Sequence, residues 1–290
     1  LIAAAYSIYG GLSAVAWTDV VQVVLLVLGG LITTFVALDQ VTPDGGIIRG
    51  INHIYDVAGD KFHMILDRSN PEFNNLPGIA VLVGGMWVAN LYYWGFNQYI
   101  IQRTLAAKSL EESQKGIVFA AFLKLIIPLI VVIPGIVAYV MFSQPEGTNT
   151  IPGVVEVFSK TGGGLDNDKA YPWLISQFVM PGFKGLVVAA LAAAIVSSLA
   201  SMLNSVATIF TMDIYKPYFN TEATDKQTVT VGRLTAILAL VIAVLVAPQL
   251  SNVPQMFQYI QEYTGLVSPG ILAVFIMGLF WKKTTTKAAI

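Results

Sequence analysis

Hydroxyl and amide side chains follow one face of a helix predicted at 182–215. The residues are Ser197, Ser198, Ser201, Asn204, Ser205 and Thr208. Their spacing of three and four residues places them on one helix face. Adjacent hydroxyls are hard oxygen ligands of the kind that small cations take. Small residues and hydroxyls also fill tight interfaces between helices. The stripe therefore predicts either a cation site or close helix packing.

Aromatic rings and side-chain amides share a second helix face, in the string VANLYYWGFNQY. The residues are Asn90, Tyr93, Trp94, Asn97 and Gln98. Rings stack on the apolar faces of sugars and amides bond to sugar hydroxyls, so this combination predicts a sugar-binding surface. The alternative is a belt of aromatic residues at a membrane interface. The cluster begins fourteen residues after Leu76, nearer the middle of the segment than its end, and this favours binding.

Three charged residues lie inside otherwise apolar segments: Asp19, Lys124 and Glu262. A charge within a membrane costs at least about 2.5–3.5 kcal/mol and usually faces a cavity or a partner. The alternative is a side chain near a helix end that reaches the interface. Asp19 and Lys124 lie deep enough to favour a functional role. Glu262 belongs to a third polar stripe with Gln258 and Gln261.

Composition and charge define the class of protein. Of the 290 residues, 56% are hydrophobic and only 11% are charged, against about 25% charged in soluble proteins. Uncharged runs cover 20–38, 73–102, 125–145, 185–212, 234–261 and 263–281, each near or above the roughly 18–20 residues that cross a bilayer. These features predict an all-α membrane protein with no nucleic-acid partner. We find no phosphate-binding, zinc-hydrolase or serine-hydrolase motif and no cysteine, so no enzymatic activity is predicted.

The sequence predicts one transmembrane domain over 1–290. A partial span is expected at 1–9, and full spans at 12–38, 76–103, 116–142, 182–215, 228–247 and 253–281. The loops 39–75 and 143–181 carry more acidic than basic residues, whereas the joint 103–115 and the end 282–287 are basic on balance. The positive-inside rule places the basic joints in the cytoplasm and the two long loops outside. Apolar sequence at both ends predicts an internal piece of a longer protein.

Four strings resemble the sodium/solute symporter family, most of all its sodium/glucose–galactose branch. They are YGGLSAVAWTDVVQ, YYWGFNQYIIQRTLAAKS, SSLASMLNSVATIFTMDIY and FQYIQEYTGLVSPGILAVFIMGLFWKK. The resemblance covers essentially the whole chain. It implies a LeuT-type fold of two inverted repeats, with this chain covering the end of repeat 1 and most of repeat 2. The broken helix of the second repeat is then expected at 76–103.

The same resemblance implies sodium-coupled symport of a galactose- or glucose-type sugar across the plasma membrane by alternating access. Sodium is the co-transported ion. By motif, Asn90, Lys124 and Gln261 are implied to bond sugar hydroxyls. Tyr93 matches an aromatic residue that closes the sugar site, with Trp94 beside it as a stacking residue.

The resemblance also implies a sodium site. Ser197 and Ser198, with the backbone carbonyl of Ala194, are implied to bind the ion, and Asp19 matches an acid on its inward route. Two other classes of function stay open. One is a symporter of the same fold for inositol or an amino acid; the other is a channel or membrane receptor. The sugar-branch strings argue against the first, and polar stripes scattered over several helices argue against the second.

Overall fold

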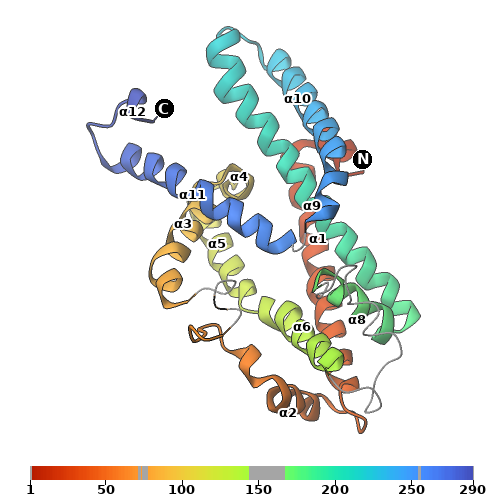
Figure 1. The fold of residues 1–290 in the computed structure, drawn as a ribbon. Helices are drawn as coiled ribbons and strands as arrows, with labels where there is room; N and C mark the ends of the chain where they lie inside the picture. Colours follow the sequence, from red (N-terminus) through yellow and green to blue (C-terminus); the bar gives the residue numbers. More distant parts are fainter. Residues whose placement is uncertain (1, 71–72, 74–77, 144–166, 254–255, 290) are drawn as a thin grey trace. The chain divides into compact units, whose positions relative to one another are not determined.

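The computed structural model describes residues 2–70, 73, 78–143, 167–253 and 256–289, and all regular structure in that part of the chain is helical (Figure 1). Most of the loop predicted at 143–181 lies outside the described residues, as do the first residues of the span predicted at 76–103. The chain divides into two units. Unit 1 comprises 1–62 and 114–254, and unit 2 comprises 63–113 and 255–290.

In the part of the chain that the structure describes, five segments are long and apolar enough to cross a membrane. They are Val15–Gln40, Leu110–Ser143, Pro181–Phe219, Asp225–Leu250 and Met256–Phe280. Helix α1 is Ile2–Gln40, and α9, Pro181–Ile209, continues without a gap into a π-helical stretch, Phe210–Phe219. Helix α10 is Asp225–Val246, followed by a 3-10 segment, Ala247–Asn252, and α11 is Met256–Phe280. A short helix, α12, spans Thr286–Ala289.

Glycine and proline do not interrupt every helix in which they occur. Helix α1 runs through Gly10 and Gly11, where a joint between two segments was expected. Helix α11 likewise passes through Gly265 and Pro269. Relative to alanine, a glycine inside a helix costs about 1 kcal/mol and a proline about 3 kcal/mol, amounts that tertiary context routinely overrides.

The span predicted at 116–142 lies within the candidate span Leu110–Ser143, which contains two helices. Helix α5, Leu110–Lys124, ends two residues before α6, Ile127–Ser143, begins. Pro128 is the second residue of α6, where its missing N–H removes no intrahelical bond, so a new helix starts readily at this point. Lys124 is therefore the last residue of α5 rather than a residue within a continuous helix. A lysine there complements the negative end of the helix dipole.

The span predicted at 76–103 is broken. A π-helical stretch, Val81–Gly85, leads into α3, Met86–Gly95, and α4, Gln98–Leu105, follows after a break at Phe96 and Asn97. The Asn97 side chain accepts a hydrogen bond from the Tyr99 backbone N–H at 3.1 Å, so it caps α4. Helix α3 packs against α11 in unit 2, where the rings of Phe96 and Phe275 stack with centroids 4.8 Å apart.

The largest apolar core of unit 1 joins four helices. Helix α2, Ile47–Ala58, is followed by a 3-10 turn, Gly59–Phe62, and α8, Ala170–Phe178, is preceded by another, Asn167–Lys169. Both helices pack on the C-terminal part of α1 and on α6 through a buried cluster that includes Leu38, Ile54, Val137 and Leu174. A Cβ atom at Gly50 would lie 2.0 Å from the Leu38 carbonyl oxygen, so only glycine allows α2 to approach α1 this closely.

Candidate sodium and sugar sites

Helices α1 and α9 pack side by side along most of their length and run in opposite directions (Figure 1). Val15 on α1 is buried against Ala200 on α9. Further along, Gly29 lies against Val187 and Ala190, and a Cβ added to Gly29 would sit 3.4 Å from the Val187 side chain. We call this contact the α1–α9 seam. Its small residues let the two backbones approach closely.

A hydrogen bond between two predicted site residues crosses the seam. The Ser197 hydroxyl on α9 donates to the Asp19 carboxylate on α1, although the two residues lie 178 positions apart in sequence. A serine hydroxyl has one proton and two lone pairs. Because its proton points at Asp19, the Ser197 oxygen keeps lone pairs with which it can bind a cation. The structure thus brings a hydroxyl oxygen and a carboxylate together at a half-buried position.

The other predicted sodium ligands lie on α9 beside Ser197. Ala194 and Ser198 are four residues apart and both are partly buried. In an α-helix the Ala194 carbonyl bonds to the backbone N–H of Ser198, and its second lone pair stays available to an ion. Ser201 and Ser205, further along the stripe, are buried at 0% and 6% exposure. The stripe is therefore buried by packing at Ser201 and Ser205, and at Ser197 it contacts Asp19.

Two predicted sugar-site residues lie on the α3–α11 pair in unit 2. Asn90 is exposed, and its amide donates to the Met86 carbonyl one turn back in α3, at 2.8 Å. Gln261 is also exposed, on the first half of α11. Nearby on that helix, the Gln258 amide donates to Glu262 at 3.3 Å. These amides extend from two helices that pack against each other. Among the described residues, the hydrogen bond of the Asn90 side chain lies within its own helix.

The predicted gate residues form an aromatic pair. The rings of Tyr93 and Trp94 meet edge to face, with centroids 5.4 Å apart. Tyr93 is partly buried and Trp94 is 43% exposed. Lys124, the third residue implied to bond a sugar, belongs to unit 1, whereas Asn90 and Gln261 belong to unit 2. The contribution of Lys124 to a common site therefore stays a prediction.

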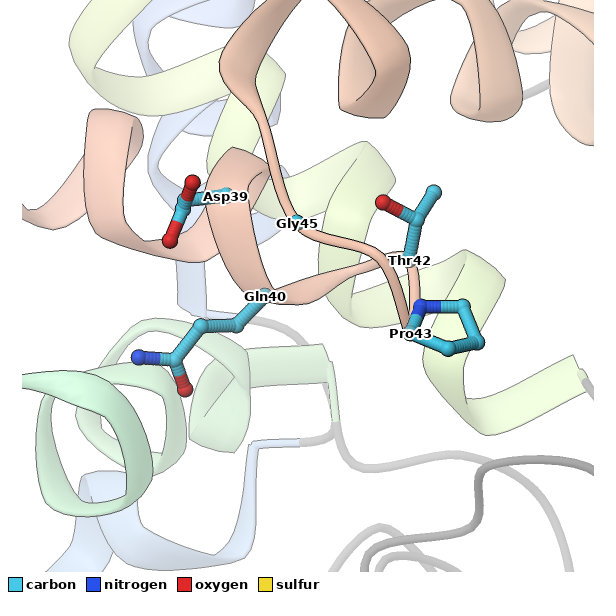
Figure 2. Close-up of a pocket in the computed structure, with 5 residues that line it drawn as sticks. All are labelled: Asp39, Gln40, Thr42, Pro43 and Gly45. Carbon is cyan, nitrogen blue, oxygen red and sulfur yellow. The ribbon is translucent and has the colours of Figure 1, made fainter.

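A polar pocket lies at the turn after α1, where Asp39, Gln40, Thr42, Pro43 and Gly45 line it (Figure 2). Its carboxylate has a structural partner, because Asp39 accepts a hydrogen bond from the Gly46 N–H at 2.8 Å. Gly45 and Gly46 have positive φ angles of 66° and 102°, which suit glycine. Asp39 follows Asp19 by twenty residues along one continuous helix, a separation of about 30 Å. This pocket belongs to the turn and not to the seam.

Within the residues that the structure describes, no three histidines or carboxylates gather into a metal site. Hydroxyl and carboxylate oxygens, as at the seam, suit a hard cation, whereas zinc, copper and iron sites commonly use imidazole or thiolate ligands. Sequence reasoning did not predict the bond between Asp19 and Ser197, since nothing in the spacing of either segment shows how α1 aligns with α9. Sequence analysis also placed Asn97 among the amides predicted to bind a sugar. In the structure the Asn97 side chain caps the N-terminus of α4.

Comparisons with known proteins agree over the whole chain. The family model "Sodium:solute symporter family" matches residues 1–290. A sodium/glucose cotransporter of Vibrio parahaemolyticus is 63% identical over 290 residues, covering 100% of this chain and 53% of that protein. The human sodium/myo-inositol cotransporter 2 is 34% identical, covering 99% of this chain and 44% of the relative. The chain thus spans about half the length of these relatives.

A solved structure has a similar fold. It is a Na⁺-coupled sialic acid symporter in a substrate-bound, outward-open state, with a TM-score of 0.71 and 24% sequence identity. The match covers 97% of this chain and 54% of that protein. At this identity the likeness speaks for the fold alone, and it confirms the LeuT-type fold predicted from the sequence.

Proposed function

Because the chain belongs to the sodium:solute symporter family, we propose that its protein couples the entry of a sugar to the entry of sodium by alternating access. Membership makes it a multi-pass membrane transport protein and not an enzyme. The observation that carries the proposed sugar specificity is the 63% identity to a sodium/glucose cotransporter. The plasma membrane is the proposed location.

In this proposal the sodium ion binds at the α1–α9 seam. The Ser197 and Ser198 hydroxyls and the Ala194 carbonyl are its ligands. The Ser197–Asp19 hydrogen bond supports this assignment, because it orients a hydroxyl with its lone pairs free. Asp19 also lends a negative charge next to the site, so it is the proposed acceptor for an ion that leaves toward the cytoplasm.

The sugar binds through Asn90, Gln261 and Lys124, with Tyr93 and Trp94 as the closing aromatic pair. Support comes from the packing of α3 on α11 and from the local bond of Asn90, which a sugar hydroxyl can replace without separating two helices. The break at Phe96 and Asn97 supports it as well. Irregular backbone at membrane depth is tolerated where it is buried in protein or lines a cavity.

The test is uptake of labelled solutes by vesicles that contain the full natural protein. We expect galactose or glucose to accumulate when a sodium gradient is imposed, and not when choline replaces sodium. A panel with myo-inositol, sialic acid and amino acids separates the sugar from other solutes. Counterflow, in which internal unlabelled sugar speeds the entry of labelled sugar, separates a carrier from a channel. Accumulation of inositol in preference to both sugars would contradict the proposed specificity.

A further inference from the structure

Gln22 carries an unpaired, buried oxygen on the face of α1 that contacts α9. Val15, Asp19 and Gly29 make that contact, and Gln22 follows their three- and four-residue helical spacing. Its side-chain Oε1 is buried and accepts no hydrogen bond from any described residue. Buried polar atoms without a partner are rare in folded proteins, and each one requires an explanation such as an ion or a bound water. Gln22 lies three residues after Asp19, on the same helix face. It is therefore one turn away from the carboxylate that Ser197 contacts.

The register of the two helices shows which part of α9 Gln22 faces. Asp19 pairs with Ser197, and Gly29 lies against Val187 and Ala190. Interpolation between these two contacts places Gln22 opposite residues 194–195 of α9. That position is the level of the Ala194 carbonyl, one of the proposed sodium ligands. Ala193 and Ala194, at this level of α9, are partly buried and have the smallest side chains after glycine.

The groups at this level are oxygens that offer lone pairs. They are the Asp19 carboxylate, the Ser197 hydroxyl, whose proton is already donated to Asp19, the Ala194 carbonyl and the Gln22 amide oxygen. Where such oxygens converge they attract a hard cation, and neutral amide and carbonyl oxygens are among its usual ligands. A bound water is the alternative occupant, because it also satisfies an unpaired acceptor.

We propose that the Gln22 amide oxygen binds the transported sodium ion between the Ala194 carbonyl and the Asp19 carboxylate, and so helps to set the affinity for sodium. This inference rests on the proposed function. It assigns to α1 a neutral ligand in addition to the acid at Asp19. Sodium binding then links α1 to α9 through two side chains of α1 instead of one.

The test is sodium binding by the full natural protein, purified and measured with ²²Na⁺ in the absence of sugar. Gln22→Met keeps the length of the side chain and removes the oxygen. We expect it to raise the half-saturating sodium concentration about tenfold, as the loss of a partner in an ion site commonly does. Gln40→Met, at the exposed end of the same helix, is the matched control and is expected to leave sodium binding unchanged.

A second variant keeps the inference testable where Gln22→Met fails to fold. Gln22→Asn retains the amide and withdraws its oxygen by one methylene group, so a weaker sodium affinity is expected there too. Sodium binding equal to that of the parent in a folded Gln22 variant overturns the inference and favours a bound water. If the parent protein itself binds no sodium, the proposed function is overturned together with the inference. If the parent binds sodium and the folded Gln22 variants bind it equally well, only the inference fails.

Discussion

The candidate site residues of the two units differ in the hydrogen bonds that hold them. In the α1–α9 seam of unit 1, Ser197 on one helix bonds to Asp19 on another. In the α3–α11 pair of unit 2, Asn90 bonds to Met86 in its own helix and Gln258 bonds to Glu262 in its own helix. A ligand that displaces the first bond changes how two helices are joined. A ligand that displaces either of the others needs only a rotation of side chains.

This difference suggests a division of labour. An ion at the seam acts on the packing of α1 against α9, so its binding can be coupled to a change in helix arrangement. A sugar at α3 and α11 exchanges local hydrogen bonds for its own, which costs little and favours binding of a polar ligand. Substitutions in the seam are therefore expected to alter sodium dependence, and substitutions on the α3–α11 pair to alter sugar affinity.

The largest effect is expected from the double variant Ser197→Ala with Ser198→Ala. Both hydroxyls leave the proposed site and Asp19 loses a donor, so the sodium concentration for half-maximal uptake rises about tenfold or more. Sugar binding at saturating sodium suffers less. The measurement is sugar uptake by the full natural protein over a range of sodium concentrations.

Ser205→Ala is the matched control, because Ser205 is buried on the same stripe but lies two turns beyond the proposed site. Its sodium dependence stays that of the parent. If the stripe serves packing alone, the pattern reverses: alanine at 197 and 198 is nearly silent, while a larger residue there disrupts folding. An unaltered sodium dependence in the double variant removes both serines from the site.

A smaller effect is expected on the other side of the comparison. Asn90→Ala and Gln261→Ala each remove a group that is proposed to bond a sugar hydroxyl, which costs about 1.4 kcal/mol, or about tenfold in sugar affinity. Sodium affinity changes only indirectly. Sugar binding is measured by competition at saturating sodium, with the exposed Asn52→Ala as the control. Equal sugar affinity in both variants at equal expression argues against the assignment.

Asn97→Ala sharpens the comparison within unit 2, because Asn97 shares the amide-rich segment with Asn90 but caps α4. Loss of an asparagine cap costs about 1 kcal/mol of stability. We expect a lower unfolding temperature with unchanged sugar affinity per folded molecule. Asn97→Asp restores an acceptor for the Tyr99 N–H and should recover most of the stability. A loss of sugar affinity without a loss of stability identifies Asn97 as a binding residue instead.

The sequence was sufficient for the class of fold but not for every helix boundary. Long uncharged runs predict membrane helices because no other arrangement hides so many apolar residues from water. Pro128 marks a break between α5 and α6, while Pro134, Gly10 and Gly265 do not interrupt their helices. Proline thus lies at a helix break in one place and inside a continuous helix in another. Whether it interrupts the helix depends on tertiary packing, which a single sequence does not reveal.

The candidate site shows a similar limit. Residue types and spacing predicted a functional charge at Asp19 and a cation site or close packing at Ser197 and Ser198. The resemblance implied that the serines bind sodium and that Asp19 lies on its inward route. The hydrogen bond between Asp19 and Ser197 depends on how α1 aligns with α9 over 178 positions of sequence, and periodicity within one helix holds no information on that alignment. The unpaired oxygen of Gln22 had only one visible signal, its three-residue distance from Asp19 in the string WTDVVQ.

The smallest effect on transport is expected from three cysteine substitutions that test which side of the membrane each joint faces. Asn52, Lys108 and Asn167 are exposed, and this chain has no cysteine of its own to compete for the reagent. Acidic loops around Asn52 and Asn167 and the basic joint around Lys108 place the first two outside and the third in the cytoplasm. An impermeant thiol reagent added to intact cells should therefore label positions 52 and 167, and should label position 108 only after the membrane is opened. Labelling at 108 in intact cells, with 52 spared, means that the orientation is reversed, and Asp19 would then lie on the entry side of the sodium path instead of the exit side.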